Sequence, residues 1–353
     1  MRILYCIPTL GGGGAERQVR LITAEFAKRG VEIGVMARFS PIDLDALQAA
    51  GVHCIPLDAK GNHSPGLAWS VMTETRSSRW PIVQSWLTQM DVLVGIASRA
   101  SKTRWILSER SSAAHYAQGW KNALRRRLGS RADYIIANSA KGLEYWQGEP
   151  TRKAIIPNAV DLEAIVARCD DRVQEKGRST PSIVSVGRLD QWKNFGALIR
   201  SQAALRRRGV MARLAILGDG PLRAELNALI TDLDLHDRVS LEGFATDIVE
   251  WLRRSDLYVS TSLYEGQPNA VLEAAAANVP LVLSDIAAHR ELFGDEAILV
   301  DRQDPEAIAD GISQLLGDRV QARRNAAAAF AKVERQSIES IATRYLECYA
   351  DLI

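Results

Sequence analysis

Residues 2–17 read RILYCIPTLGGGGAER and decide the fold class. Residues 2–7 form an apolar run that is typical of a buried strand, and residues 15–29 repeat apolar side chains at helical spacing. Four glycines at residues 11–14 join the two segments. A strand that passes through a glycine-rich turn into a helix is typical of the first unit of a parallel, Rossmann-like sheet.

The same alternation continues along the chain in two series. The first series predicts strands near residues 2–7, 31–38, 52–57, 82–84, 105–107, 134–137 and 154–156. A polar stretch at residues 168–182 predicts a linker. The second series predicts strands near residues 182–186, 213–217, 239–241, 257–260, 281–283 and 297–300. We therefore expect an α/β protein of two doubly wound domains, residues 1–165 and 176–335, with a helix at residues 336–353 that packs back on the first domain.

The composition is that of a folded, two-domain protein. The 353 residues are 47% apolar and 24% charged, which is enough to bury two cores and excludes disorder. No stretch approaches the roughly 18 consecutive apolar residues of a membrane span, and residue 1 leads directly into a strand, so we expect a cytoplasmic protein. The four cysteines lack CxxC or histidine-paired spacing and predict neither a metal site nor a disulfide framework.

Charge is distributed unevenly. Residues 1–160 contain 21 Lys and Arg against 12 Asp and Glu, whereas residues 161–353 contain 23 against 30. The basic half favours an anionic partner, with scattered solubilising charge as the alternative. Residues 120–131, WKNALRRRLGSR, predict a short amphipathic helix that can rest on an anionic membrane, with a stripe buried in the core as the alternative. Its basic side chains are Lys121, Arg125, Arg126, Arg127 and Arg131. Nucleic acid is not expected, because no aromatic-interleaved or groove-reading motif accompanies the charge.

The glycine-rich turn can contact an anion. Glycines let backbone N–H groups approach a ligand closely, and the helix that follows favours negative charge at its start. A dinucleotide-binding turn would read GxGxxG with an acidic residue about 20 residues on, whereas the second strand here ends in Arg38. We therefore expect Gly14 to contact a phosphate or sugar rather than a nicotinamide or flavin cofactor, with a flexible turn as the alternative.

Residues 187–194, GRLDQWKN, follow the first strand of the second series. Arg188 can bind a diphosphate bidentately and Lys193 can bind it as a point charge from another side. Ordinary surface cations are the alternative, but loops at the carboxyl end of a parallel strand are where ligands bind.

Two further loops of the second series favour nucleotide contact. The first is residues 218–221, GDGP, which follows the second strand of the series. Gly218 permits a tight turn there, as Gly187 does after the preceding strand. After the next strand, the ring of Phe244 can hold a flat base or, alternatively, enter the core.

Residues 264–277, YEGQPNAVLEAAAA, carry the most information about chemistry. Pro268 suits the first turn of a helix, whose first backbone N–H groups lack intrahelical partners and favour an anion. Glu265 precedes that helix, and Glu273 lies inside it, roughly 7–8 Å along the axis at ~1.5 Å per residue. A diphosphate at the helix start would have one carboxylate near its sugar and the other near its ribose. A solvated glutamate is the alternative for Glu273, although the helix is otherwise nearly all apolar.

In this order the motifs resemble those of the family-4 retaining glycosyltransferases of GT-B fold, whose mark is a Glu-x7-Glu pair. The pair here is Glu265 and Glu273. The other matching segments span nearly the whole chain and are GAER at 14–17, IPNAVD at 156–161, GRL at 187–189, KN at 193–194 and GDGP at 218–221.

The resemblance implies two Rossmann-like domains that face a cleft, an acceptor-binding first domain and a nucleotide-sugar-binding second domain. It implies that Arg188 and Lys193 hold the donor diphosphate, that Glu273 binds the ribose and that Glu265 lies at the donor sugar. The backbone of the loop would contact sugar and phosphate at Gly266, Gln267, Asn269 and Ala270. Transfer would retain the anomeric configuration and require no metal or other cofactor.

One position departs from the family pattern. Many members carry a histidine that follows a central strand of the first domain and reaches the donor sugar. Residues 107–112 here read LSERSS, which places Arg110 where that histidine would be. Some relatives that act on lipid-linked oligosaccharides have a similar stretch, so Arg110 stays a catalytic candidate.

These features predict a glycosyltransferase that uses a nucleotide-sugar, expected to be a UDP-sugar. The acceptor is expected to be a glycan or a lipid-linked glycan of the cell surface, with the protein in the cytoplasm or peripheral on the inner face of the membrane. Two other functions stay open: a sugar-nucleotide epimerase on the same fold, and a non-catalytic donor-binding subunit.

Overall fold

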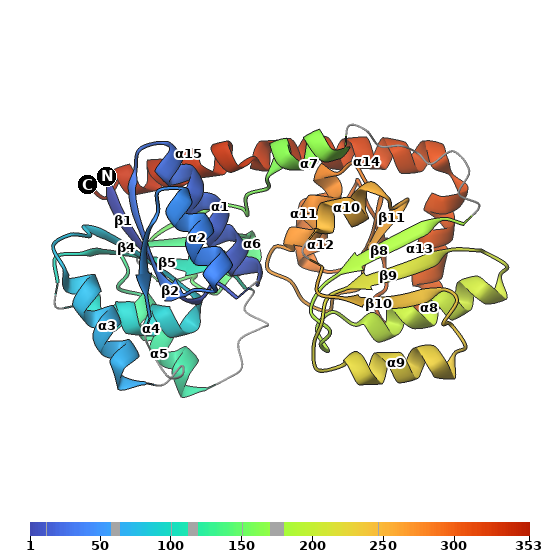
Figure 1. Cartoon of the computed structure of the whole chain (residues 1–353), viewed down its shortest axis with the longest axis horizontal. Helices are drawn as coiled ribbons and strands as arrows, with labels where there is room; N and C mark the ends of the chain where they lie inside the picture. The colour runs from blue at the N-terminus through green and yellow to red at the C-terminus, as the bar shows by residue number, and fades with distance from the viewer. Residues whose placement is uncertain are drawn as a thin grey trace. The chain divides into compact units, whose positions relative to one another are not determined.

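The computed structural model describes residues 1–11, 13–57, 64–99, 101–111, 119–149, 151–169, 180–245 and 247–353. These residues divide into two compact units, Met1–Ala159 with Gln336–Ile353 and Val160–Arg335. Each unit is built around its own parallel sheet, and Figure 1 labels many of the elements of both. Across the described residues, every helix is too short or too polar to span a bilayer.

The strands of the first unit are β1 (Arg2–Thr9), β2 (Glu32–Arg38), β3 (His53–Pro56), β4 (Ile82–Trp86), β5 (Arg104–Glu109), β6 (Tyr134–Ala137) and β7 (Arg152–Ile155). They form one parallel sheet in the order β3-β2-β1-β4-β5-β6-β7. The chain winds outward from β1 in one direction and then from β4 in the other. Ligands of such sheets bind at the carboxyl ends of the strands near this reversal.

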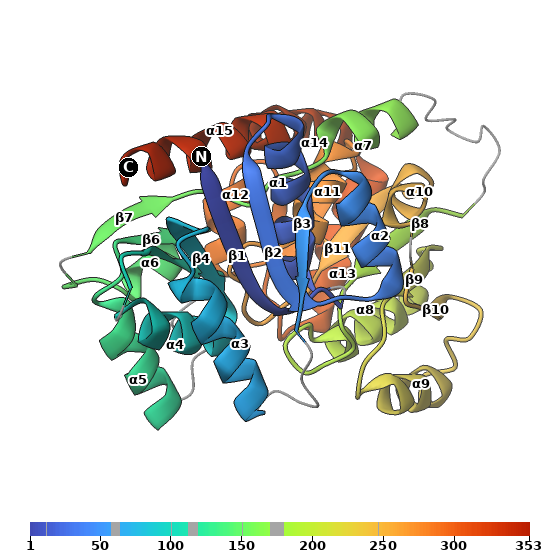
Figure 2. The ribbon, with the colours of Figure 1, turned by 60° about the vertical axis from the view of Figure 1, so that its left-hand side comes forward.

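Helices cover both faces of this sheet, as Figure 2 shows. They are α1 (Gly14–Lys28), α2 (Pro41–Ala49), α3 (Pro65–Arg76), α4 (Leu87–Ser98), α5 (Trp120–Gly129), α6 (Ala140–Glu144) and α15 (Ile338–Ala350). On one face α1 and α15 enclose a core that includes Phe26 and Tyr349. On the other face α3, α4 and α5 enclose a second core that includes Val71, Met90 and Leu128. The sheet is therefore doubly wound, as the alternation of the sequence predicts.

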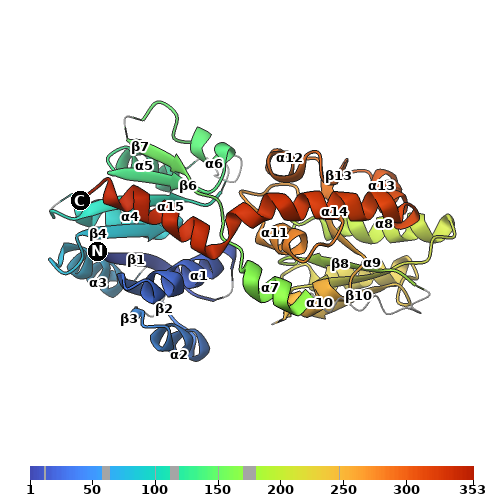
Figure 3. The same ribbon diagram turned by 90° about the horizontal axis from the view of Figure 1, so that it is seen from above.

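The C-terminal helix α15 is part of the first unit. Its side chains Ile341, Ala342, Tyr345 and Tyr349 are fully buried in the first unit's core, where both tyrosine rings pack edge-on against Phe26 of α1. Figure 3 shows α15 running along the first unit beside α1. Burying each large apolar side chain contributes about 1.5–3 kcal/mol, which is why the helix returns to this sheet. The predicted return of residues 336–353 is confirmed.

The strands of the second unit are β8 (Ser182–Val186), β9 (Arg213–Leu217), β10 (Val239–Gly243), β11 (Leu257–Ser260), β12 (Leu281–Ser284) and β13 (Ile298–Val300). They form a parallel sheet in the order β10-β9-β8-β11-β12-β13, so its winding reverses between β8 and β11. The helices are α7 (Leu162–Cys169), α8 (Phe195–Arg207), α9 (Arg223–Asp232), α10 (Ile248–Arg253), α11 (Asn269–Ala276), α12 (Ala287–Phe293), α13 (Pro305–Gly317) and α14 (Arg319–Val333). One core lies under α8, α9 and α13, and the other under α7, α11 and α14.

Each predicted strand is present, and the α/β fold class of two doubly wound sheets is confirmed. Several strands run further than their apolar residues alone indicate: β1 continues to Thr9 and β5 to Glu109. The second unit begins at Val160 rather than at the predicted residue 176, and the first does not extend to residue 165, because Val160 and Ile165 are buried in the core of the second unit. Of the predicted linker at 168–182, residues 170–179 lie outside the described part of the chain.

Candidate active site

The turns after β8 and β9 pack against each other through their backbones. Gly187 N donates to Leu217 O at 2.9 Å. A Cβ atom on Gly218, whose φ is +140°, would lie 1.9 Å from Gly187 O, and a Cβ atom on Gly187 would lie 3.0 Å from the Lys193 side chain. Gly218 therefore excludes a side chain for both steric and backbone reasons, and Gly187 lets Lys193 lie across the turn.

Lys193 and Glu265 form an ion pair at the reversal point of the second sheet. Lys193 Nζ lies 2.5 Å from Glu265 Oε1, which also accepts a hydrogen bond of 2.7 Å from Ser262 Oγ. The two loops are also joined by Thr261 Oγ1, which donates to Lys193 O at 3.1 Å. Because Lys193 follows β8 and Glu265 follows β11, adjacent strands bring together two predicted site residues that are 72 positions apart in sequence.

The surroundings of Glu265 keep its carboxylate charged. Burial by itself raises the pKa of this group, but the charge and hydrogen bond of Lys193, with the hydroxyl of Ser262, hold the pKa below its usual range. At neutral pH the Glu265 carboxylate is therefore ionised where it meets Lys193.

Arg188 does not join this pair. Its side chain is 73% exposed, and its guanidinium lies 4.0 Å from the carboxylate of Asp190. The two cations predicted to bind one diphosphate thus share a loop but differ in state: Lys193 is engaged with Glu265, and Arg188 extends into solvent.

The helix α11 begins at Asn269, one residue later than Pro268. Pro268 precedes the helix and its carbonyl accepts from Leu272 N at 3.2 Å, which corrects the prediction that Pro268 lies in the first turn. Gly266 and Gln267 lead into the helix, and Ala270 lies in its first turn, where backbone N–H groups have no intrahelical partner.

Glu273 is buried on α11 among alanine, valine and leucine side chains. Burial, and after it the charges of Glu265 and Glu273, raise the pKa of the Tyr258 hydroxyl on β11. Both carboxylates therefore lie near this one ring. The alternative of a solvated Glu273 is wrong.

Two predicted ligand contacts lie at other strand ends. Phe244 follows β10 and is 70% exposed, so its ring does not enter the core. Gly14 begins α1 in the first unit, directly after the glycine-rich turn.

Arg110 follows β5 in the first unit and is held by three partners. Its guanidinium lies 4.0 Å from the centroid of the Trp86 ring, Nη1 donates to Asn158 Oδ1 at 3.2 Å, and Nη2 donates to the hydroxyl of Tyr345. Tyr345 belongs to α15, so the C-terminal helix fixes the position of this catalytic candidate.

One predicted membrane contact is wrong. Arg125 is only 1% exposed and lies 2.7 Å from Asp91 and 2.9 Å from Glu109, both fully buried. Its side chain points inward because these two carboxylates require a cation, and Leu128 on the same face enters the core. The surface of α5 and the residues after it retain exposed basic side chains at Lys121, Arg126, Arg127 and Arg131, next to Trp120, which is 73% exposed.

The sequence reasoning missed His289, which lies on α12 and is fully buried. Its Nδ1 lies 2.8 Å from Ser284 O. Burial lowers the pKa of the ring, and the charges of Glu265 and Lys193 also act on that pKa, in opposite directions. A single histidine without a spaced partner gives no pattern that could have revealed it.

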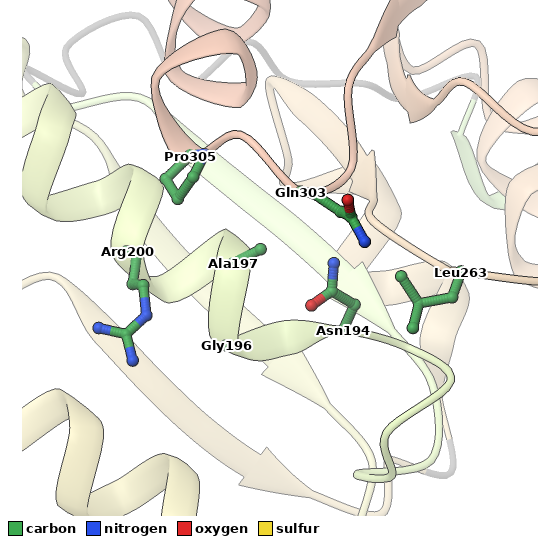
Figure 4. Close-up of a pocket in the computed structure, with 7 residues that line it drawn as sticks. All are labelled: Asn194, Gly196, Ala197, Arg200, Leu263, Gln303 and Pro305. Carbon is green, nitrogen blue, oxygen red and sulfur yellow. The ribbon is translucent and has the colours of Figure 1, made fainter.

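A pocket of about 410 Å³ opens beside the loop that carries Lys193 and Asn194. Figure 4 shows the residues that line it. Asn194, which directly follows Lys193 and has a left-handed backbone, donates to Arg302 O at 2.7 Å at this site. The lining residues are Asn194, Gly196, Ala197, Arg200, Leu263, Gln303 and Pro305.

Both halves of the chain match glycosyltransferase families. Residues 12–164 match the family model described as Glycosyltransferase Family 4, and residues 180–318 match the one described as Glycosyl transferases group 1. In both halves, and in its two doubly wound sheets, the chain is therefore similar to the group 1 glycosyltransferases of GT-B fold.

Among curated proteins, the chain is 32% identical over 231 residues to the N-acetylgalactosamine-N,N'-diacetylbacillosaminyl-diphospho-undecaprenol 4-alpha-N-acetylgalactosaminyltransferase of Campylobacter jejuni. That match covers 62% of each chain. It is 29% identical over 184 residues to the UDP-Gal:alpha-D-GlcNAc-diphosphoundecaprenol alpha-1,3-galactosyltransferase of Escherichia coli, covering 49% of this chain and 47% of that one. The chain thus matches less than two thirds of the length of these relatives.

Solved structures share the fold across nearly the full chain. Anabaena Alr3699/HepE in complex with UDP and glucose superposes with a TM-score of 0.85 at 21% identity, over 99% of both chains. Sucrose-phosphate synthase from Thermosynechococcus elongatus superposes with a TM-score of 0.84 at 20% identity, over 100% of this chain and 99% of that one.

Proposed function

We propose that this protein is a retaining glycosyltransferase that moves a sugar from a UDP-sugar to a glycan or lipid-linked acceptor in cell-surface polysaccharide or glycolipid biosynthesis. The observation that carries the proposal is the Lys193–Glu265 ion pair at the point where the second sheet reverses, beside a turn closed by glycines. Two of the relatives are named as enzymes that transfer a sugar to a diphospho-undecaprenol-linked acceptor. These names support the choice of acceptor.

In the proposed reaction the second unit binds the donor and the first binds the acceptor. Lys193 turns from Glu265 to the diphosphate, which Arg188 contacts from the solvent side, while the start of α11 faces its charge. Glu273 binds the ribose, and Glu265 lies at the donor sugar.

The bond between the sugar carbon and the diphosphate oxygen then breaks, and an acceptor hydroxyl oxygen forms a bond to the same face of that carbon. The acceptor proton passes to the departing diphosphate. Cations and helix amides that bind the leaving group more strongly as its charge develops lower the barrier.

A thermal-shift and hydrolysis panel over UDP-, GDP- and ADP-sugars tests this function. We expect UDP-sugars to stabilise the protein and to be hydrolysed slowly without acceptor. Release of an epimeric nucleotide-sugar would instead establish the epimerase, and stabilisation without turnover or hydrolysis would establish a donor-binding subunit.

The variant Lys193→Ala is expected to bind UDP about 10- to 100-fold more weakly, because a hydrogen-bonded contact between ammonium and diphosphate is worth about 1.5–3 kcal/mol. Isothermal titration of UDP measures this change. Lys332→Ala is the matched control, since Lys332 pairs with Glu296, whose side chain is 13% exposed, close to the 14% of Glu265. Equal UDP affinities in both variants would remove Lys193 from the site.

Metal independence is part of the proposal. Excess EDTA is expected to leave the turnover of the active UDP-sugar within about twofold, because the cations Arg188 and Lys193 and the start of α11 take the role that a divalent ion plays elsewhere. A loss of turnover that added Mg²⁺ or Mn²⁺ restores would contradict this.

The exposed side of α5 is proposed to contact the inner face of the membrane. Exposed basic residues contribute about 1 kcal/mol each near an anionic surface, so replacing Lys121, Arg127 and Arg131 by Ser is expected to weaken binding to phosphatidylglycerol vesicles about a hundredfold. Vesicle sedimentation measures this, with neutral phosphatidylcholine vesicles and Lys332→Ser as controls. Equal sedimentation of the wild type with both kinds of vesicle would overturn the membrane proposal.

A further inference from the structure

The imidazole of His289 is fully buried and has a defined proton position. Its Nδ1 lies 2.8 Å from Ser284 O and 3.2 Å from Ser284 Oγ. A carbonyl oxygen only accepts hydrogen bonds, so Nδ1 carries the proton and donates to it. Burial lowers the pKa of His289, which leaves the ring neutral.

A row of hydrogen bonds leads from this ring to the carboxylate. Ser284 Oγ, at the end of β12, donates to Ser262 O at 2.7 Å, and Ser262 Oγ donates to Glu265 Oε1 at 2.7 Å. Both serines are buried. The imidazole therefore fixes Ser284, and Ser284 fixes the backbone of Ser262. Ser262 in turn donates to Glu265.

Packing does not explain why this position is a histidine. His289 Nε2 is buried and has no hydrogen-bond partner among the described residues. An unsatisfied buried acceptor costs about 1–3 kcal/mol, a cost that an apolar side chain of similar size would avoid. The feature that such a side chain would lack is the Nδ1–H that holds Ser284.

We propose that His289 is a positioning residue for Glu265, acting through Ser284 and Ser262. The inference rests on the proposed function, in which Lys193 leaves Glu265 for the donor diphosphate. Among the described residues, Oε1 then loses Lys193 Nζ and keeps Ser262 Oγ as a donor, so the orientation of that serine decides where the carboxylate points at the donor sugar.

Three substitutions separate this role from packing. In His289→Asn the amide N–H can occupy the place of Nδ1–H and donate to Ser284 O. In His289→Gln the amide lies further out, at the place of Nε2, and His289→Leu removes both nitrogens. A packing role would favour Gln over Asn, because Gln is closer to His in volume, whereas the positioning role favours Asn.

The measurement is kcat for the most active UDP-sugar together with the affinity for UDP, on variants that melt close to the wild type. We expect Asn to keep kcat within about threefold, Gln and Leu to lose about tenfold or more, and UDP affinity to be unchanged in all three, since a misplaced group costs turnover. His236→Asn and His236→Gln, at an exposed histidine of the same unit, are the controls and should match the wild type. Gln as active as Asn, or Leu as active as the wild type, would overturn the inference.

A second measurement does not depend on turnover. Long-range ¹H–¹⁵N spectra of the wild type, with the resonance assigned by its loss in a His289 variant, should show a neutral ring protonated on Nδ1 at pH 7. A ring protonated on Nε2 would overturn the inference by itself. If the wild type turns over no nucleotide-sugar, the proposed function fails, and this spectrum still reports separately on the hydrogen-bonded row.

Discussion

Replacing Glu265 by Gln is expected to lower kcat about 10²- to 10³-fold, the loss typical of removing one group that stabilises a charged transition state. Gln keeps an oxygen that can accept from Ser262 but loses the negative charge that faces the donor sugar in the proposed reaction. UDP affinity is expected to stay within about threefold, because Lys193 loses a competing partner and remains available to the diphosphate. Steady-state kinetics together with UDP titration check both values.

Glu296→Gln is the matched control for this variant, since Glu296 is similarly shielded and is also paired with a lysine. It should leave kcat unchanged. If Glu265→Gln lost UDP affinity in proportion to turnover, Glu265 would be a general binding group rather than one that acts on the reacting sugar.

The wild type should also show a defined acid limb. The folded-state pKa of Glu265 lies below the usual carboxyl value of 4.5, so the ionised form predominates above that value. Turnover that depends on this charge is lost only as the pH falls through the lowered pKa, so kcat/KM should not change with this group between pH 6 and 8 and should fall only in acid below pH 4.5.

Arg125→Met is expected to destabilise the first unit by about 3–5 kcal/mol, because it leaves two buried carboxylates without their cation. Glu109 also accepts from Trp146 Nε1 at 3.0 Å and from Ser111 N at 3.0 Å, so the loss reaches the segment that carries Arg110. Urea unfolding followed by tryptophan fluorescence measures the change, since Trp146 and Trp105 report on this core.

Arg126→Met is the matched control, one residue along the same helix. Arg126 is half exposed and lies 3.5 Å from Glu149, a geometry for which ion pairs contribute about 0–1 kcal/mol. The triple variant Asp91→Asn, Glu109→Gln, Arg125→Met should recover part of the lost stability, because it removes the unpaired charges. Arg125→Met as stable as Arg126→Met would contradict the assigned network.

The loss in Arg125→Met should depend on pH. Burial raises the pKa of Asp91 to about 6 in the wild type, even though Arg125 and Ser85 act in the opposite direction. A folded-state pKa above the unfolded value of about 3.9 means that the folded chain binds this proton more tightly, so the folded state is favoured as the pH falls through about 6. In Arg125→Met the folded state binds the proton of Asp91 still more tightly. The loss in the free energy of unfolding should therefore be smaller at pH 5 than at pH 8.

Much of the fold could be predicted because strand and helix patterns are local. The apolar runs of β1 and β8, followed by glycine turns, are visible within about ten residues. The meeting of Lys193 and Glu265 was also predictable, since both follow parallel strands and carboxyl ends of neighbouring strands share an edge. Their pairing with each other, rather than with a diphosphate, depends on distances that no pattern encodes.

The residues that sequence reasoning misjudged have distant partners. Arg125 resembles its basic neighbours on α5, and only the packing of α4 and β5 brings Asp91 and Glu109, 34 and 16 residues away, to its guanidinium. His289 contacts Ser284 locally, but its link to Glu265 depends on the pairing of β11 with β12, which brings Ser284 to Ser262. Such contacts follow from tertiary packing, which the periodicity of a helix or strand in the sequence does not predict.

Because residues 336–353 supply buried tyrosines to the core around β1, the ribosome finishes the second unit before the first can be complete. A stop codon at Gln336 would therefore leave the core of the first unit incomplete, although that unit is translated first. Anyone expressing the halves separately must assign this tail to the fragment 1–159, either by fusing it ahead of Met1 or by supplying it as a peptide.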